Sequence, residues 1–170
     1  TLHADLSELE YEPKATIPHF HDFSHQQAQL IRRQLLLPGP DQDMAEVLLD
    51  QMQQQPEIPG TSQLIHGDPK LTNALYRDGE AFTFIDWDTM MRGSPLLDVA
   101  DMLRSMTGML RDKNPDMNKD ALLPIVLGYY AQARPETDID TFFEQSVSAT
   151  RVMALGLAMR YLTDTVDGTY

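Results

Sequence analysis

The sequence predicts an α+β fold that is mostly helical and carries one small β-hairpin region. Apolar residues recur at helical spacing over most of the chain, and the longest such pattern covers residues 139–166. Three short runs, Leu64–Ile65, Asn73–Tyr76 and Ala81–Trp87, have the length of strands, and Asp78-Gly79 between the last two is a hairpin turn signal. With 170 residues and 42% apolar content, the chain is long enough for one domain with a sizeable core.

The N-terminal third is expected to be helical on both sides of an irregular loop. A short helix near residues 2–9 comes first. Ser24 is the predicted N-cap of a helix over residues 24–37, which Pro38-Gly39-Pro40 ends. We expect Asp41 to cap the next helix, whose buried side is predicted to hold Met44, Val47, Leu48 and Met52.

Three histidines, His19, His21 and His25, occupy the loop before the first long helix. Imidazole is a common metal ligand, but Pro18 and Phe20 interleave the histidines and no carboxylate spacing completes a standard site. A packed aromatic loop is therefore favoured here over a metal site.

The chain after the hairpin is predicted to be helical. A loop over residues 90–94 leads to Pro95, which fits the first turn of a mostly buried helix. Asp98 and Asp101 lie three residues apart in that helix and so share a face. Further helices are expected over residues 119–133 and 139–166.

Composition narrows the classes of function. The net charge of −13 disfavours nucleic-acid binding, which needs a basic surface. The acidity suits either simple solubility or a metal site with a cationic or neutral polar substrate. No apolar run reaches membrane-spanning length, and the absence of cysteine excludes disulfides and thiolate metal sites. We expect a cytoplasmic protein, and the start at Thr1 indicates a fragment or a processed form.

The stretch Leu64–Tyr76 reads L-I-H-G-D-P-K-L-T-N-A-L-Y and predicts a catalytic loop between two strands. Asn73 follows Asp68 by five residues, and Asp86 ends the returning strand thirteen residues later. This layout suits phosphoryl transfer, in which Asp68 accepts a hydroxyl proton while Asn73 and Asp86 hold Mg²⁺ on the phosphates of ATP.

Each residue of this pattern also has a simpler interpretation. Asp68 alone is most often a turn residue, and Lys70 alone a solvated surface charge, whereas in the pattern Lys70 would neutralise the moving phosphoryl group.

Asp86-Trp87-Asp88-Thr89 is faintly similar to the haloacid dehalogenase phosphatase motif. That motif needs a hydroxyl residue where Met90 stands and opens a parallel α/β fold, so it is disfavoured.

The joint pattern resembles the aminoglycoside phosphotransferase and choline kinase group of kinase-like enzymes. The resemblance rests on Leu64–Asp68 with Asn73, on Ile85–Asp88 and on Gly93–Ala100. It implies that Asp68 is the catalytic base and that Asn73 and Asp86 bind Mg²⁺ and, through it, ATP. By the same resemblance, Asp98 and His66 have structural roles in steadying the catalytic loop.

A closer resemblance points to the N-acetylhexosamine 1-kinase branch, which phosphorylates a sugar at its anomeric hydroxyl. It rests on Asp68–Asn73, on Asp86–Thr89 and on Arg160–Asp164 with Gly168–Tyr170. A sugar is therefore the first expectation for the substrate, with an aminoglycoside or an amino alcohol as the alternative. Asp88 is a candidate substrate or metal contact, and a plain strand-end turn residue is an equally weighted interpretation.

The family also carries an N-terminal lobe with a Gly-rich ATP cradle, and this sequence has no such loop. The resemblance therefore implies that residues 1–170 are a protein-kinase-like C-terminal lobe. Its parts would be a post-hinge segment (1–23), a catalytic and metal-binding core (64–98) and C-terminal helices (115–170). We expect its partners to be ATP, a small-molecule hydroxyl substrate and the N-terminal lobe, without which the chain is inactive. A degenerate kinase-like binding module is the alternative from another class.

Overall fold

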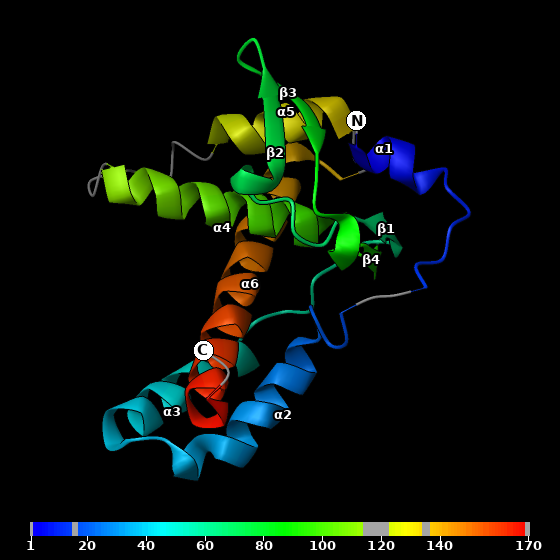
Figure 1. The fold of residues 1–170 in the computed structure, drawn as a ribbon. Coiled ribbons are helices and arrows are strands. Elements are labelled where there is room, and N and C mark those ends of the chain that lie inside the picture. Colours follow the sequence, from blue (N-terminus) through cyan, green and yellow to red (C-terminus); the bar gives the residue numbers. More distant parts are fainter. Residues whose placement is uncertain (1, 15–16, 114–122, 134–136, 169–170) are drawn as a thin grey trace. The chain divides into compact units, whose positions relative to one another are not determined.

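In the computed structural model, which describes residues 2–14, 17–113, 123–133 and 137–168, helices dominate and the strands are short (Figure 1). This confirms a mostly helical α+β fold. The elements, in chain order, are α1 (Leu2–Ser7), α2 (Phe23–Arg33), η1 (Gln34–Leu36), α3 (Gly39–Gln53), β1 (Gln63–Ile65), η2 (Leu71–Asn73), β2 (Ala74–Arg77), β3 (Glu80–Phe84), η3 (Trp87–Thr89), β4 (Met91–Gly93), α4 (Pro95–Lys113), α5 (Leu123–Ala133) and α6 (Ile139–Asp167).

The chain divides into two compact units. The first comprises residues 1–17 and 58–150, and the second comprises residues 18–57 and 151–170, so that α6 contributes to both. The candidate catalytic residues all belong to the first unit. The expected single domain, with its three segments, stays a prediction.

The first unit contains two separate two-stranded antiparallel sheets. β2 and β3 form the predicted hairpin, and both turn residues, Asp78 and Gly79, have positive φ, as a tight two-residue turn requires. β1 pairs with β4 through Ile65 opposite Met91. The expected loop over residues 90–94 was therefore wrong in part, because a strand of three residues forms where β1 offers it a partner.

Helix α4 supplies the buried face on which the catalytic loop rests. Pro95 opens it in the first turn, as expected. Its buried apolar residues are Leu96, Val99, Ala100 and Leu103. Asp98 and Asp101 are buried as well, at 2% and 3% exposure, so the predicted shared face points into the protein.

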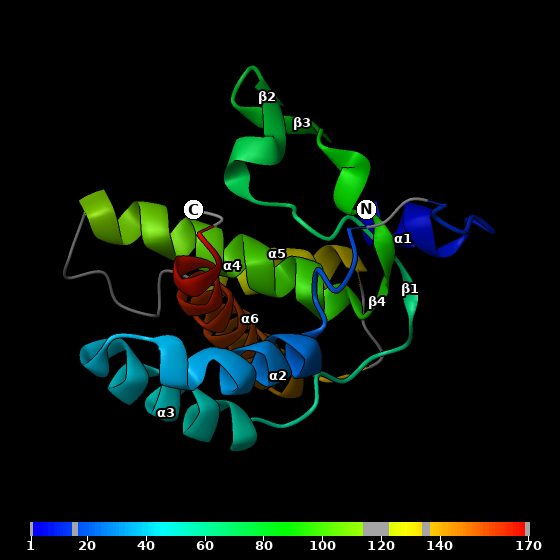
Figure 2. The ribbon, with the colours of Figure 1, turned by 60° about the horizontal axis from the view of Figure 1, so that its bottom comes forward.

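The second unit brings α2, η1 and α3 beside the C-terminal part of α6 (Figures 1 and 2). α2 and α6 approach closely at Gly156, where an added Cβ would lie 2.5 Å from the Phe23 ring. Arg33 donates a hydrogen bond from Nε to Asp167 at 2.8 Å. The predicted helix over residues 139–166 is confirmed by α6. The predicted helix over 119–133 is described from Leu123 onward, and its earlier residues lie outside the described ones.

Three details of this unit differ from expectation. Asp22 caps α2 by accepting a hydrogen bond from the backbone N–H of His25 at 2.9 Å, so Ser24 is not the cap. α3 begins at Gly39 after Pro38, which places Asp41 in its first turn rather than at the cap. The buried side of α3 is formed by Ala45, Leu48 and Met52, whereas Met44 and Val47 are exposed. Ala45, Leu48 and Met52 are spaced by three and four residues and so share one side of the helix, which leaves Met44 and Val47 outside that side.

Within the part of the chain that the structure describes, no helix combines the length and the apolar character needed to cross a membrane.

Candidate active site

Strand β1 leads directly into the candidate catalytic loop, and Gly67 makes the sharp exit possible. Gly67 has φ +87°, a conformation that side chains with a Cβ rarely adopt. An added Cβ would lie 2.4 Å from the carbonyl oxygen of Thr89. The Thr89 hydroxyl donates to the carbonyl of His66 at 2.9 Å, so the loop and η3 are held in direct contact.

The buried carboxylate of Asp98 holds the backbone of this loop. Oδ2 accepts from the backbone N–H of His66 at 2.9 Å, and Oδ1 accepts from that of Gly67 at 2.8 Å. His3 of α1 donates from Nε2 to Oδ2 at 2.8 Å. Three donors therefore satisfy a carboxylate that burial would otherwise make costly.

The His66 ring ties the loop to the end of the hairpin. The ring is fully buried, and its Nε2 lies 3.0 Å from the carbonyl oxygen of Ile85, which can only accept. Nε2 must therefore carry the proton, and Nδ1 is free to accept from the backbone N–H of Asp68 at 3.3 Å. The Trp87 ring packs against it, with the centroids 4.4 Å apart. His66 thus connects the residues on either side of Asp86 with the start of the catalytic loop.

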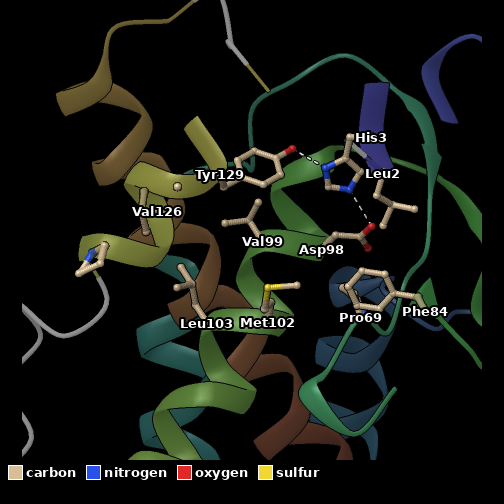
Figure 3. Close-up of a pocket in the computed structure, with 12 residues that line it drawn as sticks. Leu2, His3, Pro69, Phe84, Asp98, Val99, Met102, Leu103, Val126 and Tyr129 are labelled. Carbon is tan, nitrogen blue, oxygen red and sulfur yellow. Dashed lines mark hydrogen bonds and ion pairs between the residues drawn. The ribbon is translucent and has the colours of Figure 1, made fainter. Parts of the chain in front are cut away.

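His3 and Tyr129 are parts of this support that the sequence analysis missed. The Tyr129 hydroxyl hydrogen-bonds to His3 Nδ1, which extends the chain from Asp98 through His3 to α5 (Figure 3). Burial raises the pKa of Tyr129, with the nearby Asp98 charge adding to the effect. Neither residue belongs to a recognisable motif, so only the fold brings them to Asp98.

These groups form the polar corner of a pocket of about 350 Å³ (Figure 3). Its walls are otherwise largely apolar and come from α1, the catalytic loop, β3, α4 and α5. The lining side chains include Leu2, Pro69, Phe84, Val99, Met102 and Leu103. Such surroundings keep water from Asp98, which strengthens the hydrogen bonds that position the loop.

Asp68, Lys70, Asn73 and Asp86, which the sequence pattern grouped, lie together. Asn73 donates from Nδ2 to Asp68 Oδ2 at 3.2 Å and to Asp86 Oδ2 at 3.5 Å. It also donates to the Asp68 carbonyl at 2.9 Å. Lys70 forms an ion pair with Asp68 Oδ2, which leaves Oδ1 as the Asp68 oxygen without an amide or ammonium partner among the described residues. The Asp68 side chain is 15% exposed, so it is accessible from one side.

Asp86 and Asp88 differ in their surroundings. Asp86 has φ +70°, an unusual left-handed conformation for a residue with a side chain, and it ends the hairpin next to Asn73. Asp88 lies two residues on in η3, is exposed, and makes no side-chain hydrogen bond or ion pair with the described residues. The structure therefore brings Asp86 into the cluster and gives Asp88 no contact within it.

Asp101 is a second buried carboxylate near Asp68, and the sequence analysis gave it no role. Its Oδ1 accepts from Arg104 Nε at 2.9 Å and Nη2 at 2.6 Å, whereas Oδ2 has no hydrogen-bond donor among the described residues. Burial raises the pKa of Asp101 to about 6 despite Arg104, and the nearby Asp68 carboxylate contributes to the rise. One helical turn further on, the Ser105 hydroxyl accepts from the backbone N–H of Leu71. One face of α4 thus meets the catalytic loop at three successive points.

The comparisons with known proteins identify the family of the chain. The model of the phosphotransferase enzyme family (APH) matches residues 2–138, so the chain belongs to this family. Comparison with curated proteins gave no match.

Among solved structures, the chain is similar to a crystal structure of the aminoglycoside phosphotransferase APH(2'')-Ib with ADP bound. The two chains are 17% identical, with a TM-score of 0.42. The match covers 87% of this chain and 59% of that one, so this chain spans less than two thirds of that protein's length.

Proposed function

We propose that the chain is the catalytic lobe of an ATP-dependent kinase that phosphorylates a hydroxyl group of a small molecule. The observation that carries the proposal is the position of the Asn73 amide, which donates to the carboxylates of both Asp68 and Asp86. One side chain thereby fixes the distance between a candidate base and a candidate metal ligand. Phosphoryl transfer depends mainly on such positioning and on electrostatic stabilisation.

In this proposal Asp68 orients the acceptor hydroxyl and takes its proton. The hydroxyl donates to Asp68 Oδ1, the oxygen that neither Lys70 nor Asn73 occupies. The oxygen of the acceptor then bonds to the γ-phosphorus while the bond to the leaving ADP oxygen breaks, and the proton passes to Asp68. Lys70 places a positive charge beside the transferring group.

The donor atoms around Asn73 suit Mg²⁺, which the family implies. Asn73 uses its Nδ2 atom for hydrogen bonds, so its Oδ1 atom is available as a ligand together with the exposed carboxylate of Asp86. These are hard oxygen ligands of the kind that Mg²⁺ prefers beside phosphates and water. When bound, the ion would neutralise negative charge on the phosphates of ATP.

The hairpin surface supports the proposal that a further lobe packs here. Several large apolar side chains around the candidate site are exposed, among them Leu75, Tyr76, Phe82, Ile85 and Trp87. A concentration of exposed apolar side chains is typical of an interaction surface. We propose that an N-terminal lobe and the nucleotide cover it in the parent protein, and that the chain alone turns over no substrate.

We propose a sugar of the N-acetylhexosamine type as the acceptor. The proposal rests on the sequence similarity over residues 68–73, 86–89, 160–164 and 168–170. A cationic acceptor, such as an aminoglycoside or an amino alcohol, is the second candidate. The net charge of −13 and the exposed carboxylates of Asp86 and Asp88 favour it, because they would attract a positively charged substrate.

The first test is an ATP-consumption assay of the parent protein with its N-terminal lobe, against sugars, aminoglycosides and amino alcohols. We expect turnover on N-acetylhexosamines and a loss of about 10²–10⁴-fold in kcat for Asp68→Ala, because the variant lacks the base. Mg²⁺-ATP binding should survive this change. Turnover on aminoglycosides alone would identify a cationic acceptor in place of the sugar. Near-normal turnover by Asp68→Ala would exclude Asp68 as the base.

A second test separates the metal ligand from the base. Asp86→Ala should weaken binding of Mg²⁺-ATP itself, measured by calorimetry, because the nucleotide loses its link to the protein through the ion. Asp88→Ala is the matched control, since its carboxylate makes no contact within the cluster. Unchanged binding of Mg²⁺-ATP by Asp86→Ala would remove Asp86 from the metal site. A thermal stability of the parent protein that does not respond to Mg²⁺-ATP would favour the kinase-like binding module. Binding of Mg²⁺-ATP without turnover on any tested acceptor would leave the substrate open.

A further inference from the structure

We propose that His19, Asp22 and His25 form a binding site for a transition-metal ion of the Zn²⁺ type, in the second unit and separate from the candidate active site. Each of the three residues offers one ligand atom, and these atoms lie within 4.8 Å of one another. The sequence analysis disfavoured a metal here because no carboxylate spacing completed a site. The structure supplies that carboxylate, since the turn before α2 brings Asp22 between the two histidines.

The local geometry already holds the ligands together. The His19 and His25 rings are stacked, with centroids 3.7 Å apart and planes 6° from parallel. His19 Nδ1 lies 2.9 Å from Asp22 Oδ2, and Asp22 Oδ1 accepts from the backbone N–H of His25. Zinc bonds of about 2.0–2.2 Å place neighbouring ligand atoms roughly 3.3–3.5 Å apart, so small side-chain rotations complete the site.

The charges at this site suit a divalent cation. The Asp22 carboxylate supplies a negatively charged oxygen ligand beside the two imidazoles. His19 and His25 also line a pocket of about 370 Å³ whose wall includes Asp164 and Asp167 together with Arg33 and Arg160. Arg33 is paired with Asp167, so Asp22 is the carboxylate that faces the two imidazoles. The side chains of His19 and Asp22 are 52% and 43% exposed, so an ion reaches them from solvent.

The ligand set distinguishes this site from the oxygen cluster of Asn73 and Asp86. Two imidazoles with one carboxylate favour Zn²⁺, Co²⁺ or Ni²⁺, whereas Mg²⁺ prefers oxygen ligands alone. Of the remaining histidines, His3 and His66 are buried and hydrogen-bonded. Three protein ligands leave a fourth position for water or an added group, as in zinc sites that are open to exchange.

His21 provides a matched control within the same loop. It lies between the two ligand histidines in sequence, but its ring packs beside Phe20 and Phe23, at centroid distances of 4.5 and 6.1 Å. His21→Gln therefore removes a neighbouring imidazole without touching the proposed ligands. Asp22→Asn is the second useful variant, because Asn retains the ability to cap α2 while the charged ligand is lost.

The experiment is titration of the 170-residue chain with Zn²⁺ by calorimetry, and with Co²⁺ by visible absorption, in excess Mg²⁺ to fill oxygen-only sites. We expect one Zn²⁺ per chain with a dissociation constant on the order of micromolar. Co²⁺ should give the absorption bands of a low-coordinate site with nitrogen ligands. His19→Ala, His25→Ala and Asp22→Asn should each weaken binding at least about tenfold, and His21→Gln less than about twofold.

The proposal is overturned if the chain binds no Zn²⁺ at 100-fold excess over protein, or if His21→Gln weakens binding as much as His19→Ala does. It is also overturned if binding survives the double variant His19→Ala/His25→Ala, which would show that the ion sits elsewhere. Circular dichroism of each variant confirms that α2 remains folded, so that a loss of affinity reports the ligand and not the helix.

Discussion

Asp98 and Asp101 are two buried carboxylates one turn apart on α4, yet their surroundings are opposite. Both oxygens of Asp98 accept hydrogen bonds, from two backbone N–H groups and from His3. Asp101 has Arg104 on one oxygen and no donor on the other, and it lies near the Asp68 carboxylate. On the same helix face, both oxygens of Asp98 are hydrogen-bonded, whereas one oxygen of Asp101 has a donor and the other has none among the described residues.

The two carboxylates therefore have different roles: Asp98 supports the loop, whereas Asp101 changes its protonation with pH. A carboxylate with all its donors in place fixes the backbone of the loop. A carboxylate that is buried beside another one resists ionisation, because burial and the like charge both oppose it. Asp98 thus determines where the loop lies, whereas Asp101 makes the surroundings of Asp68 sensitive to pH.

The largest expected effect on stability comes from removing the Asp98 carboxylate. Asp98→Ala leaves two buried backbone N–H groups and His3 without an acceptor, and each orphaned donor costs about 1–3 kcal/mol. We expect the free energy of unfolding to fall by about 3–5 kcal/mol in urea denaturation. Asp98→Asn keeps one acceptor and should lose about half as much. A loss below about 1 kcal/mol for Asp98→Ala would contradict the supporting role.

Removing the Asp101 carboxylate should change how the free energy of unfolding depends on pH. The folded pKa of Asp101, about 6, lies above its ordinary value of 3.8, so the folded state holds the proton more tightly. The resulting stability is fully present below about pH 4 and is lost as pH rises through about 6. Asp101→Asn abolishes this loss. Between pH 4 and 7.5 the variant should gain about 2–3 kcal/mol relative to the wild type.

The measurement is chemical denaturation of both proteins at several pH values, with Asp138→Asn as the control. The pKa of Asp138 lies below its ordinary value, because hydrogen bonds from the Thr141 backbone and side chain outweigh the opposing effect of burial. Its loss should therefore give the opposite slope with pH. Parallel curves for Asp101→Asn and the wild type would show that Asp101 ionises normally.

The smallest effect is expected at the outer end of the Asp98 network. Tyr129→Phe removes the hydroxyl that hydrogen-bonds to His3 and should cost about 1 kcal/mol of unfolding free energy. Hydrogen exchange at the backbone amides of His66 and Gly67 should be nearly unchanged, because Asp98 still accepts from both. Faster exchange comparable to that of Asp98→Asn would show that His3 and Tyr129 are as important to the loop as the carboxylate.

The sequence predicted the helical α+β class and the clustering of Asp68, Asn73 and Asp86, because hairpin length and spacing are local properties. It could not predict β4, since Met91–Gly93 has no alternating pattern and is a strand only because β1 lies beside it. His3 was missed for a related reason. Its partners, Asp98 and Tyr129, are 95 and 126 residues away, and no local signal marks such a contact.

The helix caps show a similar limit. Ser24 and Asp22 are both good N-cap residues two positions apart, and the choice between them depended on backbone geometry that the sequence does not contain. His19, three residues before Asp22, adopts φ +58°, and no sequence pattern predicted this conformation. The proposed metal site was missed because its carboxylate is brought to the histidines by that turn.

The close approach of Gly67 to the Thr89 carbonyl also limits how this protein can evolve. Every single-base change in a glycine codon that alters the amino acid adds a Cβ atom, and here that atom would meet the main chain at 2.4 Å. Neighbouring positions can accept conservative substitutions, but every substitution of Gly67 places a Cβ atom against the main chain. In a complete mutational scan, we therefore expect no tolerated substitution at position 67.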